Sequence, residues 1–334
     1  MSQSKINKKK KVQEERPFPE ILQSILKDET LSVSSLFSLT DMNSESLALF
    51  EQRWPEADDL RRQEIARHLA DITEENFVVE FTPVFRHLLQ DPLPAVRLAA
   101  LDGLWDCTNI QMVRPIIELM QTDSDTGVRA AAASTLAHYV LMAEWGQLPK
   151  RILPRIEEAL LAEIDRPNPD TAVFRAALEA LGSSSHERVP AIIEQAYHHD
   201  LDDIRLSAIF AMGASADRRW VPIIIQELTS PSMSFRAEAA RAAGSIGSSD
   251  FLTYLQKIIA EDDDDVALVA VEAVGLIGGD LAKEILQGVL NDADAEMLHE
   301  AADEAIEEMG WLDSGLDLSL LDFSDFEEGE GEEW

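Results

Sequence analysis

The sequence predicts an all-α fold, a right-handed α-α superhelix in which helical hairpins stack into an α-solenoid. Three observations predict it. Hydrophobic residues make up 46% of the 334 residues but aromatics only 6%, and small apolar residues favour closely packed helices over a β-sandwich. The apolar residues recur at helical spacings of three and four. A unit of about 31 residues also repeats along the chain, as in proteins built from stacked helical units.

Each repeat consists of an acidic or proline-containing turn, an apolar residue followed by arginine, an alanine-rich first helix, a short break and a second apolar helix. The register is set by Arg97, Arg129, Arg175, Arg205 and Arg236, with Ala267 and His299 in the equivalent place. Five of the six successive intervals are 30 to 32 residues, and the interval after Arg129 is 46. The first helices are expected within residues 91–105, 123–137, 169–182, 200–213, 230–244 and 262–275, with a weaker copy at 292–310.

The second helices are expected at residues 112–120, 189–197, 221–228, 252–259 and 282–290, each with a stripe of leucine and isoleucine. Asp and Ser residues ahead of the first helices are natural N-caps, and the carboxylates also favour the positive end of the helix dipole. Four glycines that follow the Ala-rich segments are predicted to end the first helices in the left-handed conformation: Gly182, Gly213, Gly244 and Gly275. We expect the second helices to line the concave side of the stack.

Because of this recurring motif of acidic turn, apolar residue with arginine and Ala-rich helix, the chain resembles the HEAT-like repeats of the phycobilisome-lyase type. The resemblance covers residues 91–310 and, more faintly, 60–90, where the phrase LRRQEIA echoes the repeat about 35 residues earlier. It implies a superhelical stack that binds other proteins along its concave surface, without specifying the partner.

The predicted organisation has four parts. Residues 1–16 form a disordered basic tail with lysines at 8–11, and residues 17–90 form a helical N-terminal cap with one or two degenerate repeats. Residues 91–310 form the repeat solenoid, and residues 311–334 form a disordered acidic tail. The lysine run binds RNA or an anionic surface, folds onto the acidic tail, or is only a solvated terminus.

The five repeat arginines Arg97, Arg129, Arg175, Arg205 and Arg236 allow two interpretations. Stacked one repeat apart, they would form a basic stripe that binds an acidic ligand. Alternatively, each would bond to the acidic turn or the helix carbonyls of an adjoining repeat. We favour the structural role because the arginines occur with Asp-rich turns.

An insertion of about residues 143–154 (AEWGQLPKRILP) accounts for the long interval between the second and third arginines. It places Trp145 close to three cations, Lys150, Arg151 and Arg155, in an otherwise acidic protein. An aromatic side chain beside cations is typical of a protein-docking edge. The alternative is a simple variation in repeat length.

The C-terminal end is the most acidic part of the chain. From residue 261 onward there are 25 acids and one cation, Lys283. This segment therefore carries about two thirds of the net charge of −35. Acids alternate there with large apolar residues, among them Leu320, Leu321, Phe323, Phe326 and Trp334. This pattern predicts a disordered peptide that docks into an apolar, basic-rimmed groove on a partner, and a solubilising tail is the alternative.

Charge and composition restrict the partners to proteins of unknown identity. A net charge of −35 and a pI near 4.4 disfavour duplex nucleic acid. No apolar stretch is long enough for membrane insertion, and no apolar segment follows the lysine run as in a secretory signal. The single cysteine, Cys107, indicates a reducing, cytoplasmic compartment. The oligomeric state stays open.

Catalysis finds little support in the sequence, and no cofactor is expected. Deoxyhypusine hydroxylases, which resemble this repeat class, use four His-Glu pairs to hold two irons. Here His299 and Glu300 stand at a repeat-equivalent helix start, while His186 and Glu187 fall in a serine-rich break. A phycobilin lyase, which attaches linear tetrapyrroles to cysteines, is a second enzymatic alternative. We therefore predict a non-enzymatic scaffold or adaptor of bacterial, cytoplasmic type, with the partner on the concave surface and a C-terminal docking peptide.

Overall fold

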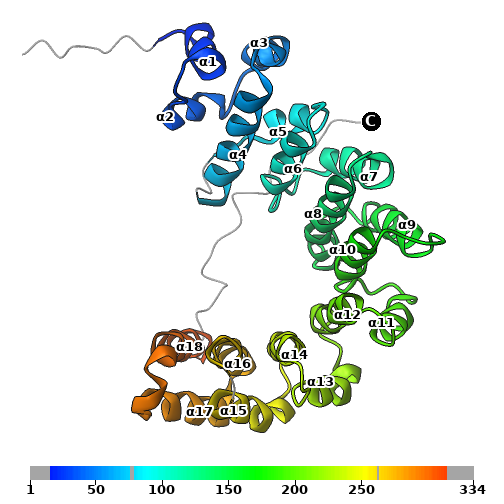
Figure 1. Cartoon of the computed structure of the whole chain (residues 1–334), viewed down its shortest axis with the longest axis vertical. Coiled ribbons are helices and arrows are strands. Elements are labelled where there is room, and N and C mark those ends of the chain that lie inside the picture. Colours follow the sequence, from blue (N-terminus) through cyan, green and yellow to red (C-terminus); the bar gives the residue numbers. More distant parts are fainter. Residues whose placement is uncertain (1–15, 76–78, 262, 314–334) are drawn as a thin grey trace, which may run out of the picture. The chain divides into compact units, whose positions relative to one another are not determined.

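The computed structural model describes residues 16–75, 79–261 and 263–313. These residues form 18 α-helices and six short 3₁₀ helices, with no strand among them, so the all-α prediction is confirmed (Figure 1). The chain divides into two compact units, Met1–Ala177 (unit 1) and Leu178–Trp334 (unit 2).

Unit 1 begins with three short helices that precede the regular hairpins. Their buried side chains include Leu22, Leu36 and Phe50, and the ring centre of Phe50 lies 5.2 Å from that of Trp54. Regular first and second helices then alternate. The helices of unit 1 are α1 (Phe18–Lys27), α2 (Val33–Leu36), α3 (Ser44–Arg53), α4 (Asp59–Glu75), α5 (Thr82–Leu88), α6 (Pro94–Asp102), α7 (Val113–Thr122), α8 (Thr126–Glu144), α9 (Leu153–Ile164) and the first part of α10 (Thr171–Leu181).

Unit 2 continues the alternation. Its helices are α11 (Val189–Tyr197), α12 (Asp202–Ala214), α13 (Val221–Glu227), α14 (Met233–Ile246), α15 (Leu252–Glu261), α16 (Asp264–Ile277), α17 (Gly279–Asn291) and α18 (His299–Asp313). The predicted helix positions agree with these bounds to within a few residues, except that α8 continues to Glu144 and α18 passes the predicted end at residue 310.

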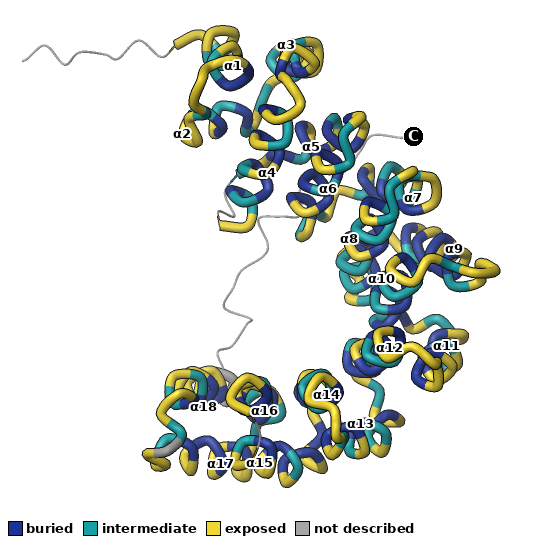
Figure 2. The backbone as a smooth tube through the Cα atoms, viewed as in Figure 1, coloured by how far each residue is buried: buried dark blue, intermediate teal, exposed yellow. Residues whose placement is uncertain are grey.

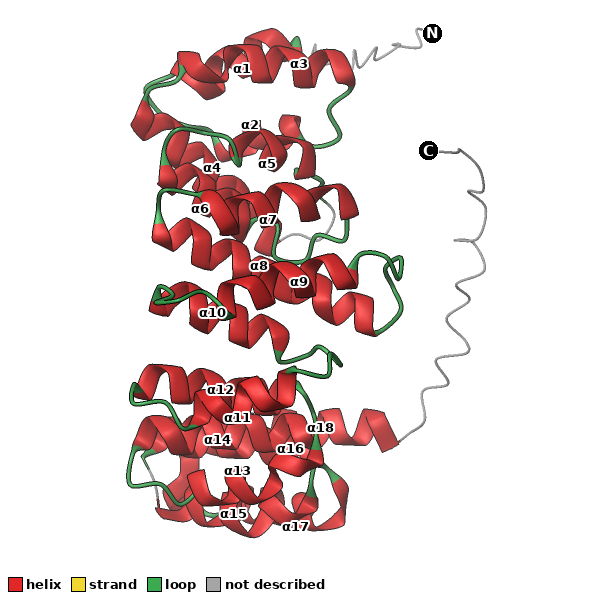
Figure 3. Ribbon diagram, turned by 90° about the vertical axis from the view of Figure 1, so that its right-hand side faces the viewer, coloured by secondary structure: helices red, strands yellow, loops and turns green. Residues whose placement is uncertain are grey.

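The core of each unit lies between a row of first helices and a row of second helices, as the dark blue segments in Figure 2 show. Figure 3 shows the same layers of helices from the side. The buried residues of α12 include Ile204, Ala208, Ala211 and Met212, which have the predicted spacing of three and four. Small residues at this face allow the first helices to pack directly on one another.

The predicted role of the repeat glycines is wrong. A Cβ atom on Gly213 would lie 2.7 Å from Cα of Ala242 in the next first helix, and one on Gly275 would lie 2.7 Å from Cβ of Ala305. Gly213, Gly244 and Gly275 lie within the helices and Gly182 directly follows α10, and the absence of a side chain at each permits close backbone approach. The left-handed conformation occurs instead at Gly247, which caps α14, while Gly278 after α16 combines a positive φ of 67° with an extended ψ of −172°.

The first helices, not the second, form the inner row of each unit. In both units neighbouring first helices contact one another more extensively than neighbouring second helices do, and in unit 2 Gly213 and Gly275 permit this close approach. The row of first helices is therefore the shorter one. Within each unit the stack therefore bends toward the first helices, with α12, α14 and α16 inside α13 and α15 (Figure 1). Our expectation that the second helices line the concave side is wrong because it ignored these close contacts.

Candidate functional site

In unit 1, a buried ion pair fixes the repeat arginine. Arg97 donates to both carboxylate oxygens of Asp123, from Nε at 2.8 Å and from Nη2 at 2.7 Å. Its Nη1 donates to the carbonyl of Asp91 at 2.7 Å, and both paired side chains are less than 10% exposed. Asp123 belongs to the turn of the next repeat, so this arginine ties consecutive repeats together.

The degenerate repeat before residue 91 contains the same kind of ion pair between an arginine and the acidic turn of the next repeat. Arg62 donates to the buried carboxylate of Asp91 at 2.8 Å, and the same oxygen accepts from Trp54 Nε1 at 2.7 Å. Asp91 also accepts from the backbone N–H of Leu93 at 2.9 Å. The pattern of arginine and acidic turn therefore begins one repeat before the region of clear sequence similarity.

Three of the other repeat arginines also make contacts close to their own turns. Nη1 of Arg129 and of Arg236 donates to the carbonyl six residues earlier, at 2.9 and 2.8 Å. Arg205 pairs with Asp202 at 3.0 Å, and its guanidinium lies 4.5 Å from the ring centre of Phe235. Arg175 is half-buried on α10. These contacts favour the structural interpretation of the repeat arginines over a ligand-binding stripe.

The insertion exposes the residues that we singled out. Trp145 follows α8 and is 65% exposed, and Lys150, Arg151 and Arg155 are exposed as well. Leu148 is buried and anchors the loop between α8 and α9. This group of Trp145 and three cations is called the insertion patch below.

The candidate residues of the C-terminal peptide lie outside the described residues, as do the lysines at 8–11. The C-terminal candidates are Leu320, Leu321, Phe323, Phe326 and Trp334.

A second exposed group lies on the first helices of unit 2 and was missed by sequence reasoning. It occupies positions one, five and nine residues after the repeat arginine position. Phe210 on α12 is 46% exposed, and Leu268 and Leu276 on α16 are 37% and 66% exposed. Three exposed acids share these positions, Glu272 on α16 and Glu304 and Glu308 on α18. We call these six residues the unit 2 first-helix face.

On α4 and α6 of unit 1, three of the equivalent positions carry paired charges. Arg67 on α4 donates from Nη1 to Asp102 on α6 at 2.7 Å, and from Nε to Asp71 at 2.8 Å. Asp102 and Arg67 both stand five residues after the repeat position, as do Phe210 and Glu304 in unit 2. The helical face of unit 2 therefore differs from that of α4 and α6 at α12, α16 and α18, whereas α14 carries Arg241 at the same position, paired with Glu238 at 3.1 Å.

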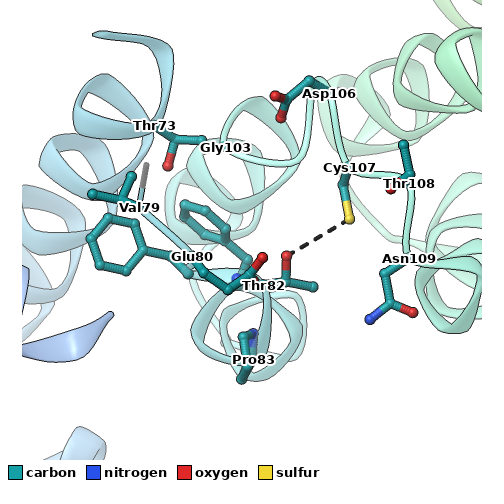
Figure 4. Close-up of a pocket in the computed structure, with 12 residues that line it drawn as sticks. Thr73, Val79, Glu80, Thr82, Pro83, Gly103, Asp106, Cys107, Thr108 and Asn109 are labelled. Atoms are coloured by element: carbon teal, nitrogen blue, oxygen red, sulfur yellow. Dashed lines mark hydrogen bonds between the residues drawn. The ribbon is translucent and has the colours of Figure 1, made fainter. Parts of the chain in front are cut away.

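Unit 1 also contains a cavity of about 480 Å³ next to the start of α5 (Figure 4). Cys107 Sγ lies 3.8 Å from Thr82 Oγ1, and the carboxyl groups of Glu80 and Asp106 line the same cavity. Nearby, burial raises the pKa of Tyr139, whose hydroxyl donates to the carbonyl of Asn109 at 3.2 Å. The tyrosine is therefore a neutral donor that links the repeats.

A buried polar pair joins α11 to α13 in unit 2. The Tyr197 hydroxyl donates to the carboxylate of Glu227, and Gln226 Nε2 donates to the same hydroxyl at 3.2 Å. Burial and the hydrogen bond to Glu227 raise the pKa of Tyr197 to about 12. Tyr197 therefore remains protonated at neutral pH and acts as the donor in this contact.

The two His-Glu pairs lie in local turn contacts. His186 Nδ1 accepts from the backbone N–H of Arg188 at 3.2 Å, and His299 Nε2 lies 2.8 Å from the carbonyl oxygen of Asp292. Among the described residues, no three His, Cys, Asp or Glu side chains are placed to hold one metal ion. No helix in that part of the chain has the length and apolar character that a membrane span needs.

The family model for HEAT repeats matches residues 46–137, 113–213, 189–274 and 221–307. The chain belongs to the HEAT-repeat family. The match begins at residue 46, in the segment assigned to the cap, and the predicted resemblance to HEAT-like repeats is confirmed. Among curated proteins, none matches the chain in sequence at a significant level.

Solved structures share the HEAT-repeat fold. The CpcE–CpcF complex of phycocyanin lyase from a Nostoc species is 16% identical, with a TM-score of 0.53, and the match covers 82% of this chain and 96% of that chain. Yeast importin-β is also 16% identical, with a TM-score of 0.52, over 87% of this chain and 46% of that chain. Human deoxyhypusine hydroxylase is 16% identical, with a TM-score of 0.35, over 88% and 96%. At 16% identity, the likeness to the first two structures shows the fold alone.

The signal for the first-helix face was present in the HEAT-repeat register. Once the arginine position is known, a helix of 3.6 residues per turn places Phe210 opposite the buried Ala208 side of α12. Sequence reasoning searched for breaks in the repeat and found Trp145, whereas Phe210 and Leu276 lie inside regular repeats.

Proposed function

We propose that this HEAT-repeat protein is a non-enzymatic scaffold or adaptor that holds a protein partner on the unit 2 first-helix face. The supporting observation is the exposure of Phe210, Leu268 and Leu276 on one face of the first helices. Grouped, exposed apolar side chains with polar neighbours are typical of protein-interaction sites. The inner row of a helical-repeat stack is also the surface on which extended partners are held.

Two further contacts belong to this proposal. The insertion patch offers Trp145 as an aromatic anchor beside Lys150, Arg151 and Arg155, and such anchors contribute strongly to binding. The C-terminal peptide, with Leu320 and Phe323 among its apolar residues, supplies a second, tethered contact. Tethering raises the effective concentration of the second contact and strengthens the complex without a larger interface.

Site-specific photo-crosslinking in the native cell tests the proposed function. A benzoylphenylalanine replaces Phe210 or Leu276 on the first-helix face, or Leu281 on α17 as the control. Leu281 is 47% exposed, which makes it a matched apolar position on the second helix of the same repeat. We expect an adduct of one defined mass at positions 210 and 276 and none at position 281, with the partner identified by mass spectrometry.

Two results would count against the proposal. Adducts at Leu281 with none at Phe210 would place the partner on the second helices. No adduct at any position would remove the scaffold function from unit 2. For the tethered contact, replacement of Leu320, Leu321, Phe323 and Phe326 by serine should lower recovery of the same adduct, and unchanged recovery would show that the tail does not dock.

A further inference from the structure

We infer that the unit 2 first-helix face binds a basic, amphipathic segment of a partner protein. This inference rests on the proposed function and deepens it, because it names the chemistry that the partner must present. Two features of the face lead to it: an apolar strip that nothing covers in the described part of the chain, and a border of carboxylates that lack counter-charges there.

The apolar strip is held in place by the helices beneath it. Cδ1 of Leu276 lies 3.0 Å from the position that a Cβ atom of Gly244 would occupy, so the leucine leans over the seam between α14 and α16 while remaining 66% exposed. Leu268 is on the same helix, and Phe210 is on α12. A partner that covers these side chains buries apolar surface without reorganising the helices.

Acids lie within the strip on α16 and beside it on α18. Glu272 stands between Leu268 and Leu276 on α16, and Glu304 and Glu308 occupy the equivalent positions on α18. Across α16, α17 and α18 the only lysine or arginine is Lys283, on the second helix α17. Arg241 is exposed at the equivalent position of α14 and pairs with Glu238 at 3.1 Å. Like charges four residues apart, as in Glu304 and Glu308, destabilise a helix. Cations of a partner relieve this repulsion.

Capping of the stack does not explain the acids on the face. Asp303 and Glu307 occupy the positions that Val271 and Gly275 hold on α16, where Val271 is buried and Gly275 faces Ala305 of α18. At the end of the stack these two acids replace apolar contacts with polar surface, as a capping repeat requires. Glu304 and Glu308 point away from that side and belong to the first-helix face, so a second cause is needed for them.

The partner's length follows from the helices that it crosses. The partner crosses the four first helices of unit 2, which are α12, α14, α16 and α18. With about 8–10 Å between neighbouring axes, these helices span roughly 30 Å. A helix of about 20 residues has that length. Apolar residues at spacings of three and four would contact Phe210 and Leu276, and flanking Lys or Arg would reach Glu304 and Glu308.

Fluorescence anisotropy of a labelled 20-residue peptide tests the inference with the full chain. The probe carries leucines on one helical face and lysine and arginine on the flanks, and two comparison peptides have the scrambled order or glutamate in place of the cations. We expect only the amphipathic basic peptide to bind, with an affinity that falls as salt is raised. The double variant Phe210→Ser with Leu276→Ser should weaken binding about 10-fold or more.

A matched pair of charge variants separates a specific site from general attraction. Glu304→Gln with Glu308→Gln should weaken binding of the basic peptide about 10-fold and make the affinity less dependent on salt. Asp303→Asn with Glu307→Gln removes the same charge from the capping side of α18, and it should change the affinity less than about 2-fold. Leu281→Ser is the apolar control on α17. Circular dichroism checks that all variants fold, since every replaced side chain is exposed.

Several outcomes would overturn the inference. Equal losses of peptide affinity in the two charge variants would show general electrostatic attraction only. Equal binding of the scrambled peptide would show that the apolar strip does not take part in binding. If replacing the lysines at 8–11 by serine tightened peptide binding, the occupant would be the chain's own basic run. A partner crosslinked at Phe210 that lacks a basic segment would overturn this inference while leaving the scaffold function standing.

Discussion

Units 1 and 2 use the same repeat but place their charges differently. Unit 1 contains 20 Lys and Arg against 28 Asp and Glu, a net charge of −8, whereas unit 2 contains 8 against 35, a net charge of −27. In unit 1, pairs such as Arg97 and Asp123 lie between repeats, with side chains 9% and 5% exposed. In unit 2, Arg205 and Asp202 are 33% and 73% exposed. The comparison shows that the buried helix faces maintain the stack, while the exposed face is free to acquire binding chemistry.

The largest expected effect is the loss of a buried pair in unit 1. Asp123→Ala leaves the Arg97 guanidinium buried without its carboxylate, and removing one partner of a buried pair costs about 3–5 kcal/mol in the free energy of unfolding. Asp202→Ala removes an exposed partner in unit 2 and should cost less than about 1 kcal/mol. Urea denaturation followed by circular dichroism measures both. Similar losses for the two variants would contradict the difference between the units.

Close packing of the first helices gives the next effect. Gly213→Ala places a methyl group against the backbone of Ala242, and such overpacking should cost about 1–3 kcal/mol in the free energy of unfolding. Gly288 on α17 has no atom within 4 Å of an added Cβ, so Gly288→Ala should stabilise by about 0.5–1 kcal/mol through helix propensity. Thermal denaturation of the two variants compares them.

The same experiment sharpens the comparison between units. The equivalent position in unit 1 is Ala137 on α8, where a methyl group is already accommodated. Ala137→Gly should therefore cost only about 1 kcal/mol, the helix-propensity difference. A gain in stability from Gly213→Ala would mean that α12 and α14 can separate without loss of packing.

The repeat register made most of the helices predictable. The arginine position and the spacing of three and four define the buried face of α12 from Ile204 to Met212, because a helix has a fixed period. Trp145 was also found from sequence, since an aromatic in an insertion has no core position to fill. These features depend on local sequence, which is why they could be derived without coordinates.

Contacts between repeats were not predictable in the same way. A glycine near a helix end suits a left-handed cap or a close backbone approach equally well, and the choice at Gly213 depends on the distance to Ala242. The identity of the inner row follows from that distance, so it was predicted wrongly too. Phe210 was missed because the search was directed at breaks in the repeat, although the register places it opposite the buried side of α12.

The smallest expected effect is a difference in pH dependence between the units. In unit 1, hydrogen bonds from Arg53 and then Lys27 lower the pKa of Glu56 from 4.5 to about 2. The folded pKa lies below the unfolded one, so Glu56 stabilises the protein above pH 4.5, and that contribution is lost as the pH falls toward 2. In unit 2, burial raises the pKa of Glu238 above 4.5, the charge of Glu179 adds to the shift, and Arg241 opposes it.

For Glu238 the folded pKa lies above the unfolded one, so lowering the pH from neutral toward 4.5 protonates the folded state first and stabilises it. Urea denaturation of Glu238→Gln should show a smaller gain on acidification over that range than the unaltered protein does. Glu56→Gln should instead show a smaller loss between pH 4.5 and 2. If both variants changed the pH profile with the same sign, the buried acid of unit 2 would be as well paired as the exposed acid of unit 1. The contrast in charge placement would then fail at these two residues.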